Sequence, residues 1–333
     1  MREMISRPDR SDQPLDLRIA LVTTRPALGL DPDLPLLVSA FESAGVAAET
    51  PCWDDGHVDW SRYDAALLRS TWDYVDRIEE FLDWCDRCAA RTRLLNPAAV
   101  VRWNTDKHYL GDLARAGVPV VPTRFIAPGE EGRGQLQRFL AGGPAATTVG
   151  DPGDFAEFVV KPAIGAGSRD ALRYARAEAG RATLHVQRLL EAGRSVMLQP
   201  YLDAVDEQGE TAVLYLAGRF SHAARKGPLL RPGAALVEGL FAPEDIRPRV
   251  PTAAELVVAA AAYAAIPFEA PAYARIDLIR DRRGAPLVLE LELTEPSLFL
   301  EHAPGAAAAF AHGLAAQLRT TAGREDAAGA RAG

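Results

Sequence analysis

The sequence predicts an α/β protein built from more than one module, and three observations carry this prediction. From Leu17 onward, short apolar runs typical of strands alternate with amphipathic runs typical of helices, as in βαβ units on a parallel sheet. Farther along the chain, strand-like runs follow one another across short turns, which indicates antiparallel sheets. A length of 333 residues also exceeds one ordinary domain and fits two or three modules with their own cores.

The expected modules are separated by loop-like stretches and flanked by ends without periodicity. Both ends are predicted to be disordered, because residues 1–15 are polar and the tail at 320–333 is Ala, Gly and Arg without a pattern. Between them we expect an N-terminal substrate-side α/β domain at 16–121, a small central α+β module at 122–202 and a C-terminal module at 203–319.

The individual elements follow from periodicity and from Gly and Pro breaks. In the N-terminal region we expect strands at 17–23, 47–53 and 63–70 and helices at 34–44, 78–90 and 105–116. In the central region we expect helices at 134–140 and 182–192 and strands at 155–162, 172–177 and 195–201. The C-terminal region should contain a strand pair turning at Ala217-Gly218, helices at 252–265 and 305–318, and a hairpin at 273–296.

Composition excludes several functional classes. The net charge of −8, from 37 basic and 45 acidic residues, argues against a nucleic-acid-binding surface. No run has the apolar length of a membrane span and the N-terminus lacks a signal-peptide pattern, so we expect a cytoplasmic protein without a membrane partner. Cys85 and Cys88 form a CxxC inside an amphipathic helix pattern, without a second Cys or His pair that would complete a zinc site.

The hairpin at 273–296 is the most informative stretch, because alternating apolar and polar residues flank a turn sequence that ends in Gly284. Folding it on Arg283-Gly284 produces two cross-strand pairs, Asp277 with Glu290 and Arg275 with Glu292. The same register directs four leucines to the opposite, core-facing side: Leu287, Leu289, Leu291 and Leu293.

Facing carboxylates need a counter-charge, because like charges directly opposite each other destabilise a strand pair. Oxygen ligands without Cys or His nearby favour Mg²⁺, so Asp277 and Glu290 are candidate metal ligands. The alternative is a solvated strand face neutralised by Arg275, Arg282 and Arg283. The hairpin alone leaves both interpretations open.

Upstream, a small-residue loop follows a strand that ends in Lys161 and is a candidate phosphate-binding loop. Its backbone N–H groups could form a concavity for phosphate, with Lys161 alongside as a point charge, although a plain turn fits equally well. The loop residues are Gly165, Ala166, Gly167 and Ser168. Lys107 lies near the start of a predicted helix, and the broken apolar segment at 199–202 could cross between modules with free backbone groups.

In their order along residues 17–318, these pieces resemble the ATP-grasp ligases, the superfamily of glutathione synthetase and D-alanine–D-alanine ligase. The resemblance implies an ATP-grasp fold, in which two α+β modules clasp ATP beside an N-terminal parallel α/β domain. It implies that Lys107 and Lys161 contact the phosphates, that Gly165 to Ser168 form a closing flap, and that Asp277, Glu290 and Glu292 bind the metal. It also implies adenine binding by Gln199, Tyr201 and Leu202, ribose binding by Glu210, with Glu207 as the alternative, and phosphoryl binding by Arg225 and Lys226.

One narrower branch is more similar, namely the O-ureido-serine cyclo-ligases of cycloserine biosynthesis and their relatives. The similarity rests on ELELTEPSLF, where Glu292 replaces the usual Asn, and on RSTWDY and NPAAVVRWNTDKHYL. The short flap and the region 227–250 depart from that branch, which leaves the substrate open.

A polar cluster after the strand at 63–70 is the candidate substrate site, because ligands of open α/β sheets bind beyond the carboxyl ends of strands. Its residues are Arg69, Ser70, Thr71, Trp72 and Asp73, and Arg231 is a further candidate. A helix-capping turn with Ser70 or Thr71 at the N-cap is the alternative interpretation.

The resemblance implies an ADP-forming ligase that activates a small amino-acid-like carboxylate as an acyl phosphate for attack by an amine or aminooxy nitrogen. Ring closure within one molecule competes with joining of two molecules, and a small-molecule kinase or a non-catalytic nucleotide-binding module is the remaining alternative. The expected cofactors are ATP and Mg²⁺, two ions, with Mn²⁺ as a substitute. A homodimer is expected by analogy with such ligases.

Overall fold

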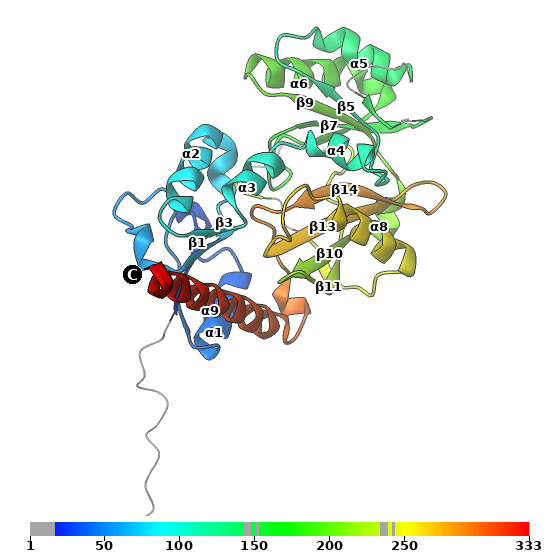
Figure 1. The fold of residues 1–333 in the computed structure, drawn as a ribbon. Coiled ribbons are helices and arrows are strands. Elements are labelled where there is room, and N and C mark those ends of the chain that lie inside the picture. Colours follow the sequence, from blue (N-terminus) through cyan, green and yellow to red (C-terminus); the bar gives the residue numbers. More distant parts are fainter. Residues whose placement is uncertain (1–16, 143–147, 151–152, 234–238, 242–243, 333) are drawn as a thin grey trace, which may run out of the picture.

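The described residues form three β-sheets, one in each of the expected modules (Figure 1). We describe it from a computed structural model, which covers residues 17–142, 148–150, 153–233, 239–241 and 244–332. The predicted disordered segment 1–15 lies outside the described residues. Within the described ranges, no helix combines the length and the apolar character that crossing a membrane requires.

The first sheet is parallel, as the alternation of strand and helix predicts, with strand order β2-β1-β3-β4. Its strands are β1 (Leu17–Thr23), β2 (Val46–Glu49), β3 (Ala65–Ser70) and β4 (Arg93–Leu95), and its connections include α1 (Asp33–Ser43) and α2 (Ile78–Ala89). Strand β3 is buried along its whole length, in keeping with a central position in a covered sheet. Cys85 and Cys88 lie on the buried face of α2 as free thiols, and burial raises the pKa of both.

The central sheet has the order β6-β5-β9-β7-β8 and is antiparallel throughout. It consists of β5 (Thr123–Ile126), β6 (Thr148–Val149), β7 (Glu157–Pro162), β8 (Leu172–Ala175) and β9 (Val196–Pro200), together with α5 (Gly132–Leu140) and α6 (Ala179–Glu191). The two helices pack on the sheet around their own apolar core, which includes Leu136, Phe158 and Val186. This core explains how about eighty residues can form a separate layer of the molecule.

The third sheet has the order β12-β11-β10-β13-β14 and carries the predicted hairpin. Its strands are β10 (Glu210–Leu216), β11 (Arg219–Lys226), β12 (Ile246–Pro248), β13 (Tyr273–Arg280) and β14 (Pro286–Glu292), preceded by α7 (Ala204–Gln208) and accompanied by α8 (Ala253–Ala264). Strands β10 and β11 turn at Ala217 and Gly218, both with positive φ, as a tight hairpin turn requires. The predicted turn is confirmed.

The helix predicted at 105–116 is shorter in the structure, α4 (Tyr109–Arg115), and a separate helix that was not predicted, α3 (Ala98–Asn104), precedes it. The break at 105–108 is held by Asp106, whose carboxylate accepts the backbone N–H of His108. Lys107 therefore lies in the break, with its own N–H donated to the carbonyl of Ala163 in the central module. Local side-chain bonding of this kind competes with helix continuation and leaves no trace in the apolar periodicity.

The C-terminal helix α9 (Ala306–Ala332) differs from the prediction, which ended the ordered chain near residue 320. An Ala-rich sequence has high intrinsic helix propensity, so the helix continues without a periodic apolar face. Its first part packs against α1 of the first sheet (Figure 1), and Phe310 and Leu314 share one core with Leu21 and Leu214. The C-terminal helix thus packs on the N-terminal domain. Apolar residues of the third sheet, such as Leu214, lie in the same core.

Two buried asparagines fasten the carboxylate hairpin to the N-terminal domain. Asn96, directly after β4, donates to the carbonyls of Tyr273 and Leu293 at 3.0 and 2.7 Å and accepts the N–H of Ala272. Asn104, at the end of α3, donates to Leu291 O at 2.8 Å and accepts the N–H of Leu293 at 2.6 Å. Satisfied buried amides of this kind fix the relative position of the two elements.

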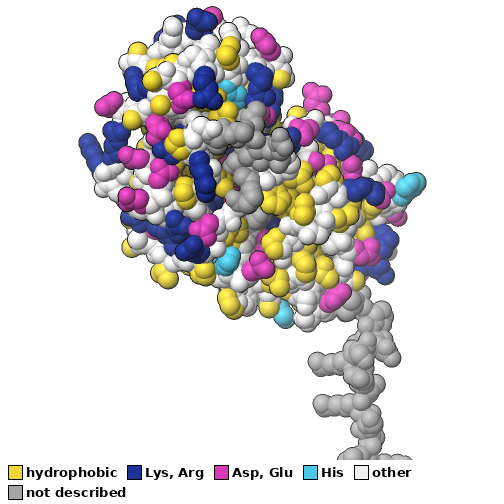
Figure 2. Space-filling view, turned by 180° about the vertical axis from the view of Figure 1, so that it is seen from behind, with side chains coloured by type: hydrophobic (Ala, Val, Ile, Leu, Met, Phe, Trp, Pro, Cys, Tyr) yellow, Lys and Arg dark blue, Asp and Glu magenta, His cyan; other side chains and the backbone are white. Residues whose placement is uncertain are grey.

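On the face shown in Figure 2, Lys and Arg side chains are interspersed with Asp and Glu side chains, in keeping with the net charge of −8.

Candidate active site

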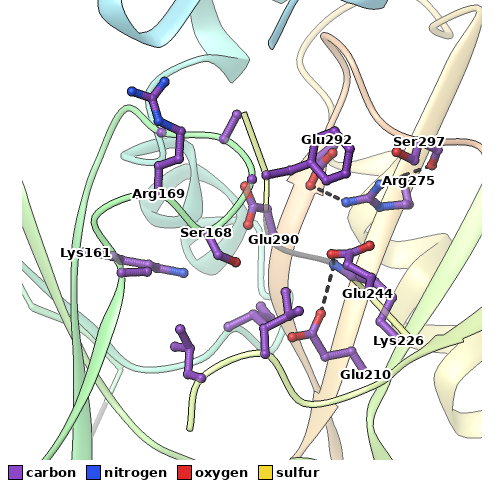
Figure 3. Close-up of a pocket in the computed structure, with 18 of the residues that line it drawn as sticks. Lys161, Ser168, Arg169, Glu210, Lys226, Glu244, Arg275, Glu290, Glu292 and Ser297 are labelled. Carbon is purple, nitrogen blue, oxygen red and sulfur yellow. Dashed lines mark hydrogen bonds and ion pairs between the residues drawn. The ribbon is translucent and has the colours of Figure 1, made fainter. Parts of the chain in front are cut away.

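A cavity of about 500 Å³ is lined by residues of the central and third sheets and by connecting segments of all three modules. Lys161, at the end of β7, reaches into it from the central module, while Lys226 of β11 and Glu290 of β14 face it from the third sheet (Figure 3). The N-terminal domain contributes Trp72 and Lys107. Side chains that lie far apart in the sequence therefore converge on one concave site.

The three lysines of the site differ in their partners. Lys107 Nζ donates to Gly165 O at 2.6 Å and pairs with Glu290 Oε1 at 3.0 Å. Lys226 Nζ lies 2.7 Å from Asp277 Oδ2 and 3.1 Å from Glu210 Oε2. Lys161 has no ion-pair partner among the residues that the structure describes, and burial lowers its pKa. Lys161 thus forms no contact ion pair, although Glu290 acts on it from a distance, and its ammonium group lines the cavity, as expected for a lysine that meets an anionic ligand.

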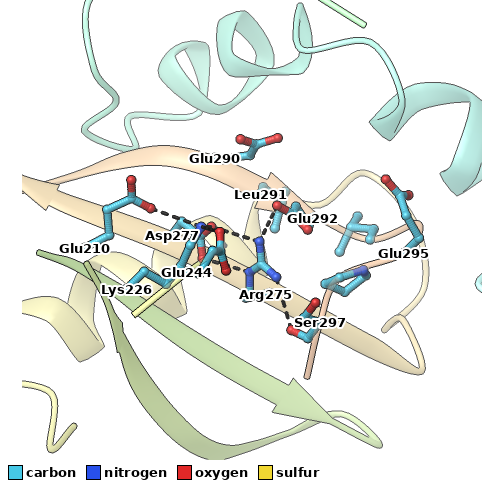
Figure 4. A network of polar contacts seen from close by, with 12 residues as sticks. Glu210, Lys226, Glu244, Arg275, Asp277, Glu290, Leu291, Glu292, Glu295 and Ser297 are labelled. Atoms are coloured by element: carbon cyan, nitrogen blue, oxygen red, sulfur yellow. Dashed lines mark hydrogen bonds and ion pairs between the residues drawn. The ribbon is translucent and has the colours of Figure 1, made fainter. Parts of the chain in front are cut away.

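The predicted register of the hairpin is confirmed at the carboxylates, because Asp277 pairs with Glu290 and Arg275 with Glu292. Arg275 donates from Nε to Asp277 Oδ1 at 2.9 Å and from Nη2 to both Asp277 and Glu292. In Figure 4 these contacts form a continuous network from Glu210 through Lys226, Asp277 and Arg275 to Glu292. The like charges that the sequence places together are therefore balanced by basic side chains.

Within the described part of the chain, no group of three or more His, Cys, Asp or Glu residues is arranged as a closed metal site. Glu290 and Glu292 line the cavity, whereas Asp277 does not, and each of the three carboxylates is turned toward a basic residue. The carboxylates could take up Mg²⁺ once the lysines exchange their carboxylate partners for phosphate. Their metal role accordingly stays a prediction.

Burial and neighbouring charge shift the carboxyl pKa values in different directions. Burial raises the pKa of Glu292 to about 8, against the lowering effect of Arg275. Burial would also raise the pKa of Asp277, but Arg275 and Lys226 hold it below the ordinary value. For Glu290, burial is likewise outweighed, here by Lys107 and Lys161. Glu210 has a raised pKa because burial exceeds the effect of Lys226.

One part of the hairpin prediction is wrong, since the four leucines do not share one face. A β-bulge shifts the register between Asp277 and Leu278, so that Leu278 pairs with Val288 and Leu289 has no partner on β13. Val288 and Leu291 are buried in the core, whereas Leu287 and Leu289 are partly buried on the other side. Leu289 lines the cavity.

The small-residue loop at 165–168 borders the cavity with all four residues. Gly167 has a φ of +62°, and a Cβ there would lie 2.3 Å from the carbonyl oxygen of Leu240, so this position requires glycine. The next residue, Arg169, pairs with Asp76 of the N-terminal domain at 2.8 Å. The loop therefore touches both other modules across the opening of the site.

The segment after β9 forms another wall, with Gln199, Tyr201 and Leu202 lining the cavity beside Glu210. The Gln199 side chain is turned away to Thr123 Oγ1 at 2.8 Å, and the Tyr201 N–H is donated to Glu157 O at 2.8 Å. Arg173 lies over the Tyr201 ring, 3.6 Å from its centroid. The crossover is thus held in place by contacts within the central sheet. Glu207, the alternative to Glu210, does not line the cavity.

Arg225 does not belong to the site, although it was predicted to act beside Lys226. Adjacent residues of a strand point to opposite faces, and Arg225 donates instead to Gln208 O at 3.0 Å and pairs with Asp245 outside the cavity. Arg231 is exposed and also does not line the cavity.

Of the predicted substrate cluster, only Trp72 lines the cavity. Ser70 bonds Thr23 Oγ1 at 2.7 Å, and Asp73 accepts from Thr24 and Trp53. Thr71 is the N-cap of a short 3₁₀ turn, Trp72–Asp76, without a side-chain cap bond. Arg69 is fully buried and donates to Pro296 O at 2.9 Å. Apart from Trp72, the residues of this cluster therefore lie outside the cavity lining, where Arg69, Ser70 and Asp73 bond neighbouring segments of the chain.

Among the cavity-lining residues that were not assigned from the sequence are Arg275, Tyr74 and Glu295. The sequence did contain a signal for Arg275. It lies two residues before Asp277 on one strand, so the two side chains point to the same face of the sheet. Glu295 lies beyond the end of β14, where strand alternation no longer applies, and Tyr74 lies in a 3₁₀ turn.

Comparisons with known proteins agree with this geometry. The family model for the N-terminal domain of D-cycloserine synthetase DcsG matches residues 19–96. The chain is 43% identical over 308 residues to the cycloserine biosynthesis protein DcsG of Streptomyces lavendulae, covering 90% of this chain and 99% of that protein. The crystal structure of D-cycloserine synthetase DcsG has a TM-score of 0.82 at 42% identity, with the same coverage of 90% and 99%.

More distant solved structures share the fold. A RimK domain ATP-grasp protein from Sphaerobacter thermophilus has a TM-score of 0.61 at 18% identity, covering 89% of this chain and 98% of that one. The ATP-grasp ligase PsnB, solved with a precursor variant, Mg and ADP, has a TM-score of 0.60 at 16% identity, covering 91% and 99%. The predicted ATP-grasp fold and ligase class are thereby confirmed. The chain belongs to the family of the cycloserine biosynthesis protein DcsG and is an ATP-grasp ligase.

Proposed function

We propose that this ligase uses ATP to activate the carboxylate of a small amino-acid-type molecule, and that a nitrogen of the same molecule then closes a ring. The observation that carries the proposal is the convergence of Lys107, Lys161 and Lys226 with Glu290 and Glu292 in one cavity, with Asp277 paired to Lys226 beside it. Phosphoryl transfer needs positioning and charge neutralisation more than covalent chemistry from side chains, and this site supplies both. Ring closure is favoured by 43% identity to the cycloserine biosynthesis protein.

The donor set fits Mg²⁺ bound together with ATP, because it consists of carboxylate oxygens next to unpaired positive charge. Asp277, Glu290 and Glu292 are the proposed ligands, and two ions are proposed, with Mn²⁺ as a substitute. When bound, the metal neutralises phosphate charge as a Lewis acid. Glu292 replaces the usual Asn, and Arg275 offsets its additional charge through the ion pair already present.

The chain's own groups divide the remaining work. Lys107 and Lys161 would bind phosphate oxygens, Lys226 would neutralise the transferring phosphoryl group, and the backbone of residues 165–168 would cover it. The segment 199–202 would bind adenine through its backbone, and Glu210 would accept the ribose hydroxyls. Excluding water is essential, since an acyl phosphate hydrolyses, and the loop at 165–168 stands at the opening for that purpose.

The proposed reaction has two steps. A substrate carboxylate oxygen attacks the γ-phosphorus, the bond between that phosphorus and the β,γ-bridging oxygen breaks, and ADP leaves. The nitrogen lone pair then attacks the carboxyl carbon, the nitrogen loses a proton, and phosphate leaves with the electrons of the C–O bond. Arg275 stands where the oxygen of the intermediate acquires charge, two residues from Asp277 on the same face of β13.

The test is a screen for phosphate release with Mg-ATP and amino acids or their ureido, aminooxy and hydroxamate derivatives, including O-ureido-D-serine. We expect ADP and phosphate in equal amounts and a ring-closed product in the mass spectrum. Hydroxylamine added to the reaction should trap the acyl phosphate as a hydroxamate. AMP and pyrophosphate as products would overturn the proposal, and incorporation of a second amine would replace ring closure by intermolecular ligation.

The proposal extends to the organisation of the protein. It includes the division at residues 121/122 and 202/203, a cytoplasmic location and a homodimer. Light scattering coupled to size exclusion measures the oligomeric state directly.

A further inference from the structure

Glu295 is a buried carboxylate that faces the cavity and that the reaction described above does not use. It lies in the loop that follows β14, three residues beyond Glu292, and its side chain is 8% exposed while lining the cavity. In Figure 4 it stands apart from the network that joins Glu210 to Glu292. It lies on the side of the site to which the N-terminal domain contributes Trp72 and Tyr74.

Glu295 lacks a direct ion pair. Asp277, Glu290 and Glu292 each contact a lysine or an arginine, whereas Glu295 forms no ion pair within the described ranges, and Lys107 and Arg275 act on it only from a distance. Burial raises its pKa to about 7, against the lowering effects of the nearby Tyr74 hydroxyl and Lys107. A ligand that places a positive charge directly against this buried carboxylate would supply the missing ion pair.

The backbone around Glu295 is held rigidly. Trp72 Nε1 donates to Glu295 O at 3.1 Å, Arg69 Nη2 to Pro296 O at 2.9 Å, and Arg275 Nη1 to Ser297 O at 3.1 Å. Trp72 also lines the cavity and packs edge-on against Phe241, with ring centroids 5.0 Å apart. Three consecutive carbonyls are thus bonded by side chains from two modules, which preorganises the carboxylate for a ligand.

We propose that Glu295, next to Tyr74, binds the α-ammonium group of the amino-acid substrate. This inference rests on the proposed function, in which Arg275 acts at the reacting carboxyl group of that substrate. Glu295 lines the same cavity as Arg275, and the loop that carries it is bonded to Arg275 through Ser297 O, so both groups of one small molecule can be bound together. The ion pair would compensate the buried charge and would select α-amino acids over simple carboxylic acids. Arg69 and Trp72 act as positioning residues of this subsite.

The test compares substrates that differ only in the amino group. Binding is measured by calorimetry in the presence of Mg-ADP, with O-ureido-D-serine against 3-(ureidooxy)propanoate and with each enantiomer of alanine against propanoate. For the wild-type protein we expect the amine to bind about 10-fold or more tightly than its deaminated partner, as for a charged group that loses its partner. Glu295→Gln should bring this ratio close to one and leave the Kd of ADP unchanged.

Two further variants separate recognition from structure. Glu301→Gln is the matched control, since Glu301 also lines the cavity but is exposed, and the amine preference should remain. Tyr74→Phe keeps the ring and removes the hydroxyl, so it should reduce the preference by a smaller factor than Glu295→Gln does.

The subsite is overturned if Glu295→Gln weakens both members of a pair equally, because that is the result of a purely structural role. It is also overturned if the wild-type protein shows no amine preference in any pair. The proposed function fails separately, namely if amine-dependent binding is found but no ring-closed product forms with ATP. In that case the ammonium subsite stands and the reaction assigned to it does not.

Discussion

Lys226 and Arg225 are neighbours on one strand, yet only Lys226 enters the cavity. Lys226→Gln should lower ATP turnover about 100-fold or more, because it removes a charge that acts on the transferring phosphoryl group. Arg225→Gln should stay within about 3-fold of wild type, as expected for a partly exposed residue outside the site. Steady-state ADP release measures both variants. Equal losses of turnover in the two variants would show that Arg225 also acts on the phosphoryl group, as the resemblance to ATP-grasp ligases implies.

Glu290→Gln tests the metal assignment by the same assay. We expect a loss of about 100-fold or more in turnover, since Glu290 is a proposed ligand and also orients Lys107. Titration with Mg²⁺ should show that the variant needs a higher concentration for half-maximal rate. Turnover near the wild-type level would remove Glu290 from the ligand set.

His185 of α6 gives the central module a pH-dependent stability. It is buried against the Tyr174 hydroxyl, and burial lowers its pKa from 6.5 to about 4. The unfolded chain therefore binds the proton first, and stability that is complete above about pH 6.5 is lost as the pH falls toward 4. Urea unfolding should show about 2 kcal/mol less stability from this group at about pH 5. His185→Gln should lack this component, and an unchanged pH dependence would contradict it.

At the residue scale, the sequence predicted the positions of the candidate metal ligands better than those of the candidate substrate-binding residues. Asp277, Glu290 and Glu292 could be placed because strand alternation and a short turn determine which residues face each other. Glu295 and Tyr74 could not, since both lie in irregular segments where no periodicity relates sequence to direction. Arg69 and Thr71 have the polarity of a substrate site, but both are buried outside the cavity lining, and Arg69 supports the loop after β14 through its bond to Pro296 O.

Because of the bulge in β14, Leu289 and Leu291 have different environments although they are only two residues apart on one strand. Leu289 lines the cavity, whereas Leu291 lies in the core. Leu289→Ala should raise the Kd of ATP about 10-fold, through the apolar contact area that it removes from the cavity wall. It should leave the unfolding free energy almost unchanged. Leu291→Ala should instead destabilise the fold by about 2–5 kcal/mol, because Leu291 is 1% exposed in the core. Calorimetry and urea unfolding distinguish these effects, and a strongly destabilised Leu289→Ala would restore the unbulged register.

Elements with strong local patterns were predicted well, and those defined by single contacts were not. The strand pair turning at Ala217-Gly218 follows from a turn that needs positive φ. The later start of the helix predicted at 105–116 depends on Asp106 and on a bond from Lys107 N to the central module, neither of which changes the apolar pattern. The long α9 depends on Ala propensity, which a search for amphipathic faces overlooks.

Across the whole molecule, Arg169 and Asp76 connect the central module to the N-terminal domain over the opening of the site. Arg169→Gln should increase ADP formation without ligated product by about 2- to 5-fold, a factor that corresponds to the small free energy of an exposed ion pair. Exchanging the two residues, as Asp76→Arg with Arg169→Asp, should restore the wild-type ratio of ligated product to ADP. Arg181→Gln, which breaks a comparable exposed pair with Glu178 on the far side of the module, is the control. An effect of equal size there would contradict a role in water exclusion.

The asparagine bonds from the N-terminal domain to the carboxylate hairpin also determine which part of this enzyme can move. Asn96 and Asn104 join α3 and β4 to both strands of the hairpin, so these two modules behave as one rigid body. We therefore expect nucleotide entry and product exit to involve rotation of the central sheet, with a hinge near Val121, whose N–H is donated to Val288 O. Backbone hydrogen exchange is measured with and without Mg-ADP. Adding Mg-ADP should slow the exchange in the central module and around residue 121, and it should leave the exchange at the residues bonded to Asn96 and Asn104 unchanged.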